Sequence, residues 1–348
     1  MRTNLRAACE TGNLAWLKEQ KANGTLGDIS ENGNCAIYAA VAAGQLEVIK
    51  WLAEESGQAV DVTTDNNYVF RIAAENGHLD IVKWLITDSE QAAKTAAYAD
   101  VAIRFSAVNG HLNVIRWLVE DYRDWIAAKK LDDQNFVRQP VDVTLDNNCA
   151  TRLAAVNGHL DSVKWLVLKS GQDIDVSELN HYALRMAAVN GHLAVIKWLV
   201  IDYPAHLAEK DEDRTKKYYA DITNHVTSAV VLAAESGHLD IVKWFVKESG
   251  QTIDVTASNL YAVRWTAQNG HLDVVRWLIE DSDQIVDCRN YQTWEAETDV
   301  ASWPAPIQDY LATVKSLQET LGLEDWKTGL DTLSQTRRRQ GSGRVSRI

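Results

Sequence analysis

Apolar and polar positions follow the same order in successive segments of this chain. In one segment, the short alanine-rich stretch Tyr68–Ala74 is followed by Gly77, and apolar residues then take most positions of Leu79–Leu85. Glycine commonly ends a helix because it adopts the left-handed conformation at low cost. The pattern therefore predicts two short helices in each segment, one before the glycine and one after it.

The second predicted helix is apolar around most of its circumference. Residues at five of its seven positions in Leu79–Leu85 are apolar, which is too much for a helix with one face in water. A single segment cannot bury this surface, whereas neighbouring segments stacked side by side can bury it.

The segment recurs eight times at a nearly fixed spacing. The glycines are Gly12, Gly44, Gly77, Gly110, Gly158, Gly191, Gly237 and Gly270, with steps of 32, 33, 33, 48, 33, 46 and 33 residues. Six of the copies keep the tripeptide Gly-His-Leu. A fixed period near 33 residues predicts a stacked repeat architecture. Such stacks mostly present extended binding surfaces rather than one catalytic cleft.

The motif Ala-Ala-x-x-Gly-His-Leu-x-x-Val-Lys-x-Leu at this period resembles the ankyrin repeat over roughly residues 4–280. The resemblance implies an all-α solenoid of antiparallel helix pairs joined by protruding β-hairpin loops, with a concave face that binds protein. We expect the array over residues 1–280, a helical C-terminal cap or extension over 281–331, and a basic disordered tail over 332–348.

The chain departs from the common ankyrin pattern at the start of the first helix. The usual Thr-Pro-Leu-His is replaced by sequences such as Tyr68-Val-Phe-Arg71 and Tyr182-Ala-Leu-Arg185. Asparagine replaces the usual turn glycine at Asn66, Asn147, Asn180 and Asn259. Asparagine tolerates a positive φ, so the turn is expected to survive. This variant of the motif is similar to ankyrin arrays of amoeba-associated giant viruses and intracellular bacteria.

Two long insertions interrupt the period, at residues 120–140 and 202–225. The steps of 48 and 46 residues exceed the period by 15 and 13 residues. The insertions carry the aromatic residues Tyr122, Trp125 and Phe136, and Tyr203, Tyr218 and Tyr219. One interpretation makes them fingers that grip a partner with aromatic anchors. The alternative makes them extended helices whose aromatic rings cap a neighbouring repeat.

By resemblance, the variable contact positions are the two residues before each conserved glycine. The candidate partner-binding residues in this row are Glu75, Asn76, Val108, Asn109, Val156, Asn157, Val189, Asn190, Glu235 and Ser236. They predict a mildly apolar strip with amide donors between acidic ends, which suits a peptide or helix partner. The alternative is that the valines pack against the next repeat.

Histidine, tryptophan and arginine recur at fixed repeat positions. The histidines are about 10 Å apart in a stack, so they cannot share a metal ion, and we expect each to bond to backbone at the start of the second helix. The tryptophans are expected to be buried between neighbouring second helices. The arginines are expected to tie their own turn to the next repeat through carbonyls and carboxylates, although a row of arginines also suits an acidic ligand.

The charge of the chain narrows the class of partner. Its net charge is −13, and residues 1–331 carry −18 because five arginines and no acidic residue follow Asp331. So acidic a body disfavours general binding to nucleic acid and permits basic protein partners. No apolar run is long enough for a membrane-spanning helix. The basic tail leaves nuclear targeting open.

The four cysteines define the best case for an enzyme. None lies in a Cys-x-x-Cys pair, so a reduced, cytosol-like compartment is expected, with no metal. Cys288 falls after the last motif and has no place in the repeat, which makes it the candidate nucleophile of a cysteine-dependent hydrolase or transferase. No phosphate-binding loop is present, and we expect no cofactor.

The sequence thus predicts a non-enzymatic, monomeric, cytoplasmic module that binds a partner protein. If the viral and bacterial similarity reflects origin, the module is an effector in the host cytosol. The cysteine-dependent enzyme is the alternative.

Overall fold

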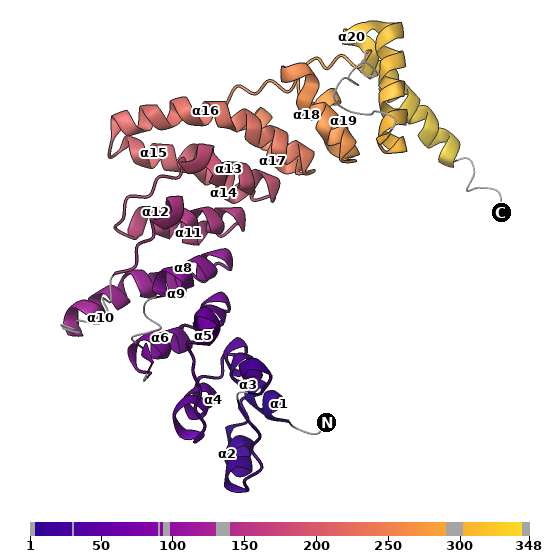
Figure 1. The fold of residues 1–348 in the computed structure, drawn as a ribbon. Coiled ribbons are helices and arrows are strands. Elements are labelled where there is room, and N and C mark those ends of the chain that lie inside the picture. Colours follow the sequence, from indigo (N-terminus) through magenta and orange to yellow (C-terminus); the bar gives the residue numbers. More distant parts are fainter. Residues whose placement is uncertain are drawn as a thin grey trace, which may run out of the picture. The chain divides into compact units, whose positions relative to one another are not determined.

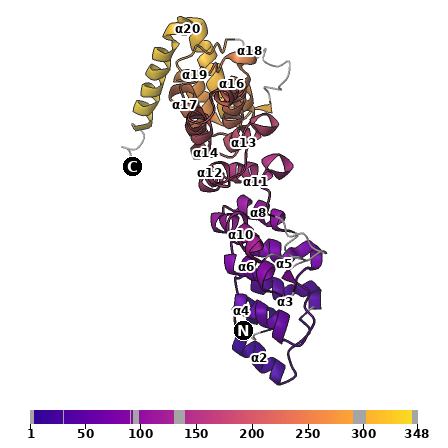
Figure 2. The ribbon, with the colours of Figure 1, turned by 90° about the vertical axis from the view of Figure 1, so that its left-hand side faces the viewer.

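The computed structural model describes residues 4–29, 31–89, 91–92, 98–129, 140–289 and 302–342. These residues form helices and connecting turns, and none of them lies in a strand. Contacts divide the chain into two compact units, Met1–Leu179 and Asn180–Ile348. Figures 1 and 2 show the helix pairs of each unit from two directions.

The first unit contains one pair of helices for each repeat. The first helices are α1 (Leu5–Glu10), α3 (Glu31–Ala42), α5 (Thr64–Glu75), α8 (Ala99–Val108) and α11 (Leu145–Val156). The second helices are α2 (Leu14–Ala22), α4 (Leu46–Lys50) with its π-helical continuation η1 (Trp51–Glu55), α6 (Leu79–Thr87), α9 (Leu112–Val119) and α12 (Leu160–Lys169). Within this unit α1 packs on α3, α3 on α5, α5 on α8 and α8 on α11, and α10 (Asp121–Lys129) follows α9.

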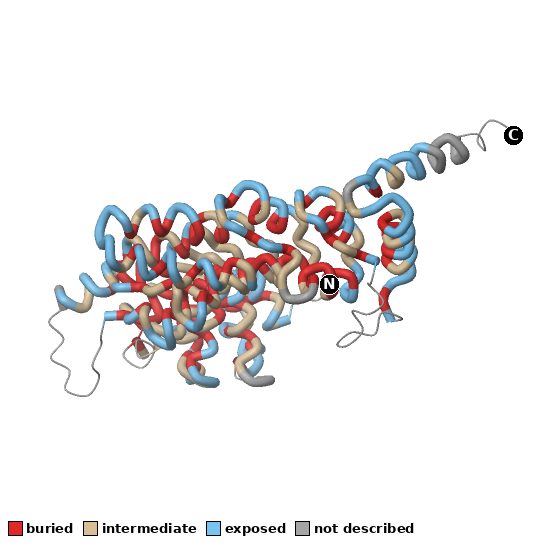
Figure 3. The backbone as a smooth tube through the Cα atoms, turned by 90° about the horizontal axis from the view of Figure 1, so that it is seen from above, coloured by how far each residue is buried: buried red, intermediate tan, exposed pale blue. Residues whose placement is uncertain are grey.

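The second unit continues the same pairing. Its elements are α13 (Glu178–Val189), α14 (Leu193–Lys197), η2 (Trp198–Asp202), α15 (Tyr203–Ala208), α16 (Glu212–Glu235), α17 (Leu239–Lys247), α18 (Ala257–Gln268), α19 (Leu272–Glu280) and α20 (Ala305–Ser342). The first helices α16 and α18 pack together, as do the second helices α17 and α19. Figure 3 shows buried residues where neighbouring helices face each other and exposed residues at the outer turns.

The connections between repeats are turns in which no described residue lies in a strand. An aspartate accepts hydrogen bonds from the N–H and hydroxyl two residues later, as Asp142 does from Thr144. The chain then makes a left-handed turn, in which the predicted residues Asn66, Asn147 and Asn180 have φ of 56°, 57° and 58°. The predicted turn chemistry is therefore confirmed, although the described residues form no strand pair around it.

Histidines join successive repeats through the backbone, as predicted. Nε2 of His78, His111, His159 and His238 lies 3.1, 2.7, 2.8 and 2.8 Å from the carbonyl oxygens of Ala42, Glu75, Val108 and Val189. A carbonyl only accepts, so each imidazole donates through Nε2–H. The ring also occupies the space beside the conserved glycine of the preceding repeat: a Cβ on Gly77, whose φ is +74°, would overlap the His111 ring. Glycine is required there for both reasons.

The recurring tryptophans are buried, as predicted. Trp51, Trp84, Trp117, Trp165, Trp198, Trp244 and Trp277 are between 3% and 8% exposed. A lysine from the preceding repeat covers several rings: Nζ of Lys83 lies 5.4 Å from the Trp117 ring centre, and Nζ of Lys197 lies 5.7 Å from that of Trp244. Such cation–π contacts keep the lysine in water while its stem covers the indole.

Recurring arginines bind the left-handed turn in the first residues of their own helix. Arg152 donates from Nε to the Asn147 carbonyl at 2.8 Å and from Nη2 to the Asp146 carbonyl at 2.7 Å. Arg185 makes the corresponding bond to Asn180 at 3.0 Å. In the first unit, Arg104 also pairs with the Asp146 carboxylate of the next repeat. The predicted structural role is thus confirmed for these residues.

A fourth recurring side chain, glutamine, was missed by the sequence analysis. Gln58, Gln91, Gln172, Gln284 and Gln318 each accept one backbone N–H and donate to one carbonyl of the preceding repeat. The acceptor bonds, from Ile29, Val62, Val143, Val255 and Cys288, are 2.8–3.0 Å long. The donor bonds, to Gly27, Val60, Val141, Ile253 and Val286, are 2.7–2.9 Å long. The signal was a glutamine two residues after a recurring serine, as in Ser282 and Gln284.

This glutamine clamp corrects the interpretation of Cys288. Cys288 takes the place that Val255 holds in the preceding repeat, and Gln318 of α20 clamps it as Gln284 clamps Val255. The repeated backbone geometry therefore continues beyond residue 280. Cys288 is one of its buried core positions rather than a residue outside the array.

The C-terminal segment forms α20, which bends at Gly322, where φ is 84°. Ile307, Leu311 and Val314 are buried, and α20 packs on α19. The helix continues to Ser342, which corrects the prediction that residue 332 begins a disordered tail. Arginine and glutamine are good helix formers, and a helix that has already formed extends easily. Residues 343–348 lie outside the described part of the chain.

Candidate functional site

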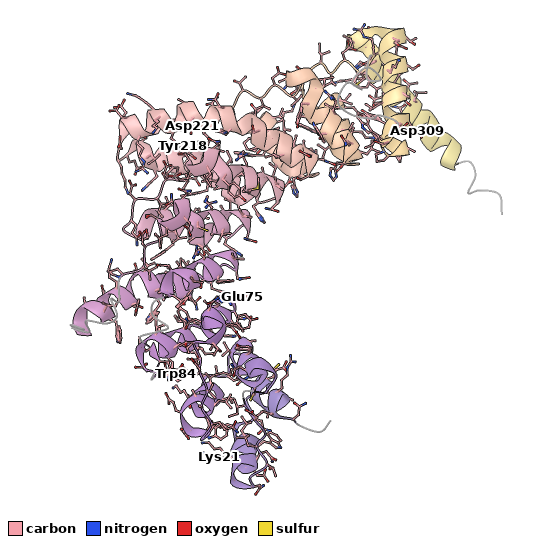
Figure 4. The ribbon with its side chains drawn as sticks, in the orientation of Figure 1. Lys21, Glu75, Trp84, Tyr218, Asp221 and Asp309 are labelled. Atoms are coloured by element: carbon pink, nitrogen blue, oxygen red, sulfur yellow. The ribbon has the colours of Figure 1, made fainter. Side chains whose placement is uncertain are left out.

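The predicted contact row lies at the C-terminal ends of the first helices. Glu75, Asn76, Asn109, Asn157 and Asn190 are exposed, whereas Val108, Val156, Val189, Glu235 and Ser236 are half-buried. We call these ten residues the first-helix row. Figure 4 labels Glu75 at the end of α5 and Trp84 on α6 of the same repeat. The row is accessible in both units, in contrast to the buried tryptophans.

The asparagines of the row are partly used by their own helices. Nδ2 of Asn76, Asn109, Asn157 and Asn190 donates to the carbonyl four residues earlier, at 2.9, 3.1, 2.9 and 3.0 Å. Each amide keeps its oxygen and one N–H for a partner. The row therefore offers acceptors as well as the predicted donors, each held in place by one bond to its helix.

The first insertion does not present Tyr122 to a partner. Its side chain is fully buried, with its ring centre 5.8 Å from those of Trp117 and Trp125. The prediction that Tyr122 is an anchor for a partner is corrected, because the ring packs against the second helix of its own repeat. Trp125 is half-buried on α10, and Phe136 lies outside the described residues.

The second insertion forms α15 and the first half of α16, and it buries two of its three tyrosines. Tyr203 and Tyr218 are stacked edge to face at 5.1 Å, and the Tyr218 hydroxyl donates to the Leu199 carbonyl at 2.9 Å. The prediction that these two contact a partner is corrected, since their own repeat covers them. Tyr219 alone is accessible, at 44% exposed.

A histidine and aspartate cluster beside Tyr218 was not predicted. Nε2 of the buried His181 lies 3.0 Å from one carboxylate oxygen of Asp221, and Nε2 of His225 lies 3.8 Å from the other. Tyr218 and Asp221 share α16 (Figure 4). The described residues hold no group of three or more histidine, cysteine or acidic side chains suited to a metal. The cluster joins α13 to α16.

A hollow of about 410 Å³ opens between α13, α16 and α18 of the second unit. Its lining includes Arg185, Ser228, Val231, Glu235 and Tyr261. Glu235 belongs to the first-helix row, so the hollow continues that row. The sequence carried a signal for it, because Ser228 and Val231 take the places of Tyr182 and Arg185 in the preceding repeat.

Another hollow, between α19 and α20, is crossed by contacts within the chain. The Tyr310 hydroxyl donates to the Glu280 carboxylate at 2.7 Å, and the Arg276 guanidinium lies 5.0 Å from the Tyr310 ring centre. Burial and the Glu280 carboxylate raise the pKa of Tyr310. Asp309 lines the same hollow (Figure 4). These contacts hold α20 on the array.

Cys288 is poorly placed for nucleophilic chemistry. Burial raises the pKa of its thiol to about 12, with a smaller contribution from Asp287. Its Sγ contacts the Val286 carbonyl at 3.8 Å. A reactive cysteine needs a lowered pKa and access to a substrate. The cysteine that carried the enzyme alternative therefore has neither property.

The stacked helix pairs and the accessible first-helix row together define this chain as a helix-pair repeat protein. Family models for ankyrin repeats match residues 37–86, 151–259 and 184–290, which together cover more than half of the chain. The chain therefore belongs to the ankyrin-repeat family, whose arrays are protein–protein interaction modules. No curated protein matches it in sequence. No helix in the described residues is long and apolar enough to cross a membrane.

Proposed function

We propose that this chain binds a partner protein through the first-helix row. The proposal is supported by a difference between two groups of recurring side chains: one group packs against neighbouring repeats, and the other is exposed to solvent. Recurring histidines, tryptophans and glutamines contact the preceding repeat, whereas Asn109, Asn157 and Asn190 are exposed and each donates a hydrogen bond to its own helix. Exposed side chains held in one conformation lose little entropy on binding.

The strongly negative charge of residues 1–331 favours a positively charged partner. Residues 1–331 carry −18, and Glu75 and Glu235 lie in the row itself. Complementary charge accelerates encounter and disfavours acidic competitors. The partner we propose is a protein with a basic segment that lies along the first helices.

We also propose that the chain acts in a reduced cytosol, as an effector on a host protein. The free state of all four cysteines supports the compartment. The similarity of the motif to arrays of amoeba-associated viruses and intracellular bacteria supports the host. Capture of one partner from amoeba lysate but not from bacterial lysate is the expected result, and capture from bacterial lysate alone contradicts the effector role.

Charge substitutions in the row test the binding proposal. The Asn109→Arg and Asn190→Arg variants are expected to lose at least about tenfold in affinity for the captured protein, because each places a bulky like charge against a basic segment. Asn113→Arg and Ala194→Arg are matched controls that add the same charge on the second helices of the same repeats. Titration with the captured protein measures these affinities, and equal affinities of the row variants and the controls would contradict the proposal.

A further inference from the structure

The hollow in the second unit lies where two residues that recur in other first helices are replaced by smaller ones. First helices α5, α13 and α18 carry tyrosine and arginine at the positions nine and six residues before the conserved glycine. The corresponding residues of α16 are Ser228 and Val231. Both are much smaller, so the volume that a phenol ring and a guanidinium occupy elsewhere is open here.

The second insertion explains this break. In α5, α11 and α13 the arginine donates to a carbonyl of the left-handed turn at the start of its helix, as Arg185 does to Asn180. No such turn precedes Ser228, because α16 runs without interruption from Glu212 to Glu235. An arginine at position 231 would lack those acceptors, and valine avoids the loss.

The chemistry of the hollow combines an apolar surface with charged sides. Val231, Leu232 and Ala262 contribute apolar surface, and Tyr261 contributes an aromatic side. Glu235 and Asp254 contribute carboxylates. Hydrogen bonds from Thr256 lower the pKa of Asp254, so that this carboxylate stays ionised well below neutral pH.

The positive charge of Arg185, which also lines the hollow, does not neutralise the two carboxylates. Arg185 is held by the Asn180 carbonyl, and two carboxylates outnumber its single charge. The surrounding body is strongly acidic. An apolar group that enters the hollow is therefore favoured if it carries a positive charge at its edge.

We propose that this hollow receives a large apolar side chain of the partner protein, next to a lysine or arginine that pairs with Glu235 and Asp254. Large side chains that fill a pocket at the centre of an interface commonly dominate its affinity. The inference rests on the proposed protein-binding function and names the anchor that the partner supplies.

Two indole probes of opposite charge test this inference on the full chain. Tryptamine carries an ammonium and indole-3-acetate a carboxylate on the same ring system. Methyl NMR of Val231 and Leu232 is expected to report tryptamine binding with a dissociation constant on the order of 1 mM. Indole-3-acetate is expected to bind about tenfold more weakly, because its carboxylate faces carboxylates.

Refilling the hollow provides the matched variant. Ser228→Tyr with Val231→Arg restores the residues of the neighbouring repeats and is expected to abolish tryptamine binding. Glu235→Gln leaves the hollow open and is expected to reduce the preference for tryptamine, which keeps the test valid if the refilled variant misfolds.

Three results would overturn the inference: no methyl shift up to about 10 mM tryptamine, equal binding of both probes, or unchanged binding in the refilled variant. None of these results would contradict the proposed function, because partner binding is tested separately by Asn109→Arg and Asn190→Arg, which do not change the hollow.

Discussion

Several recurring histidines, tryptophans and glutamines of this chain contact the repeat before them. His111 donates to Glu75, Lys83 covers Trp117, and Gln284 clamps the backbone of Val255. The histidines and tryptophans were recognisable from the sequence because they recur in nearly every copy. Each clamping glutamine stands two residues after a serine, but four of them lie outside the helix pairs and Gln318 lies in α20, so the helix pattern did not single them out.

The glutamine clamp predicts a specific stability loss. Gln284→Leu removes two hydrogen bonds to part-buried backbone, of 2.8 and 2.7 Å, and is expected to lower the free energy of unfolding by about 2 kcal/mol. Gln251 follows a serine in the same way but makes no such pair of bonds among the described residues. Gln251→Leu is therefore the control, expected to change stability by less than about 0.5 kcal/mol. Urea unfolding measures both, and equal losses would show that the clamp contributes nothing.

At the scale of the element, the insertions are part of the fold. The sequence located them correctly from the broken period, but it did not decide between exposed fingers and packed helices. The decision depends on which side of a helix Tyr122, Tyr203 and Tyr218 occupy, and that follows from the register of α10, α15 and α16. The same register leaves Ser228 and Val231 beside an open hollow. From the sequence, these two residues were visible only as exceptions to the Tyr and Arg of other repeats, and the hollow itself was not.

Adjacent tyrosines on α16 give a direct test of this packing. Tyr218→Ala removes a buried ring and its hydrogen bond to Leu199, and should cost about 3–5 kcal/mol of stability. Tyr219→Ala changes an exposed ring and should cost less than about 0.5 kcal/mol. Chemical unfolding of the two variants compares them, and a larger loss for Tyr219→Ala would mean that α16 has another register.

At the scale of the whole molecule, one repeated scaffold carries an acidic, accessible surface. The period and its resemblance to the ankyrin repeat were sufficient to predict the helix pairs and the order of their contacts. They were insufficient to locate the end of the array, because Cys288 and Gln318 continue the geometry without the Gly-His-Leu motif. The partner's charge is predicted from the acidic body of residues 1–331.

The central claim is that the partner lies on the first helices and not on the second. Site-specific photo-crosslinking tests it most directly, with benzoylphenylalanine placed at Asn190 on the end of α13 or at Ala194 on α14. Both positions are exposed and belong to the same repeat. The account predicts a covalent adduct with the captured protein from position 190 and none from position 194. An adduct from position 194 alone would contradict it.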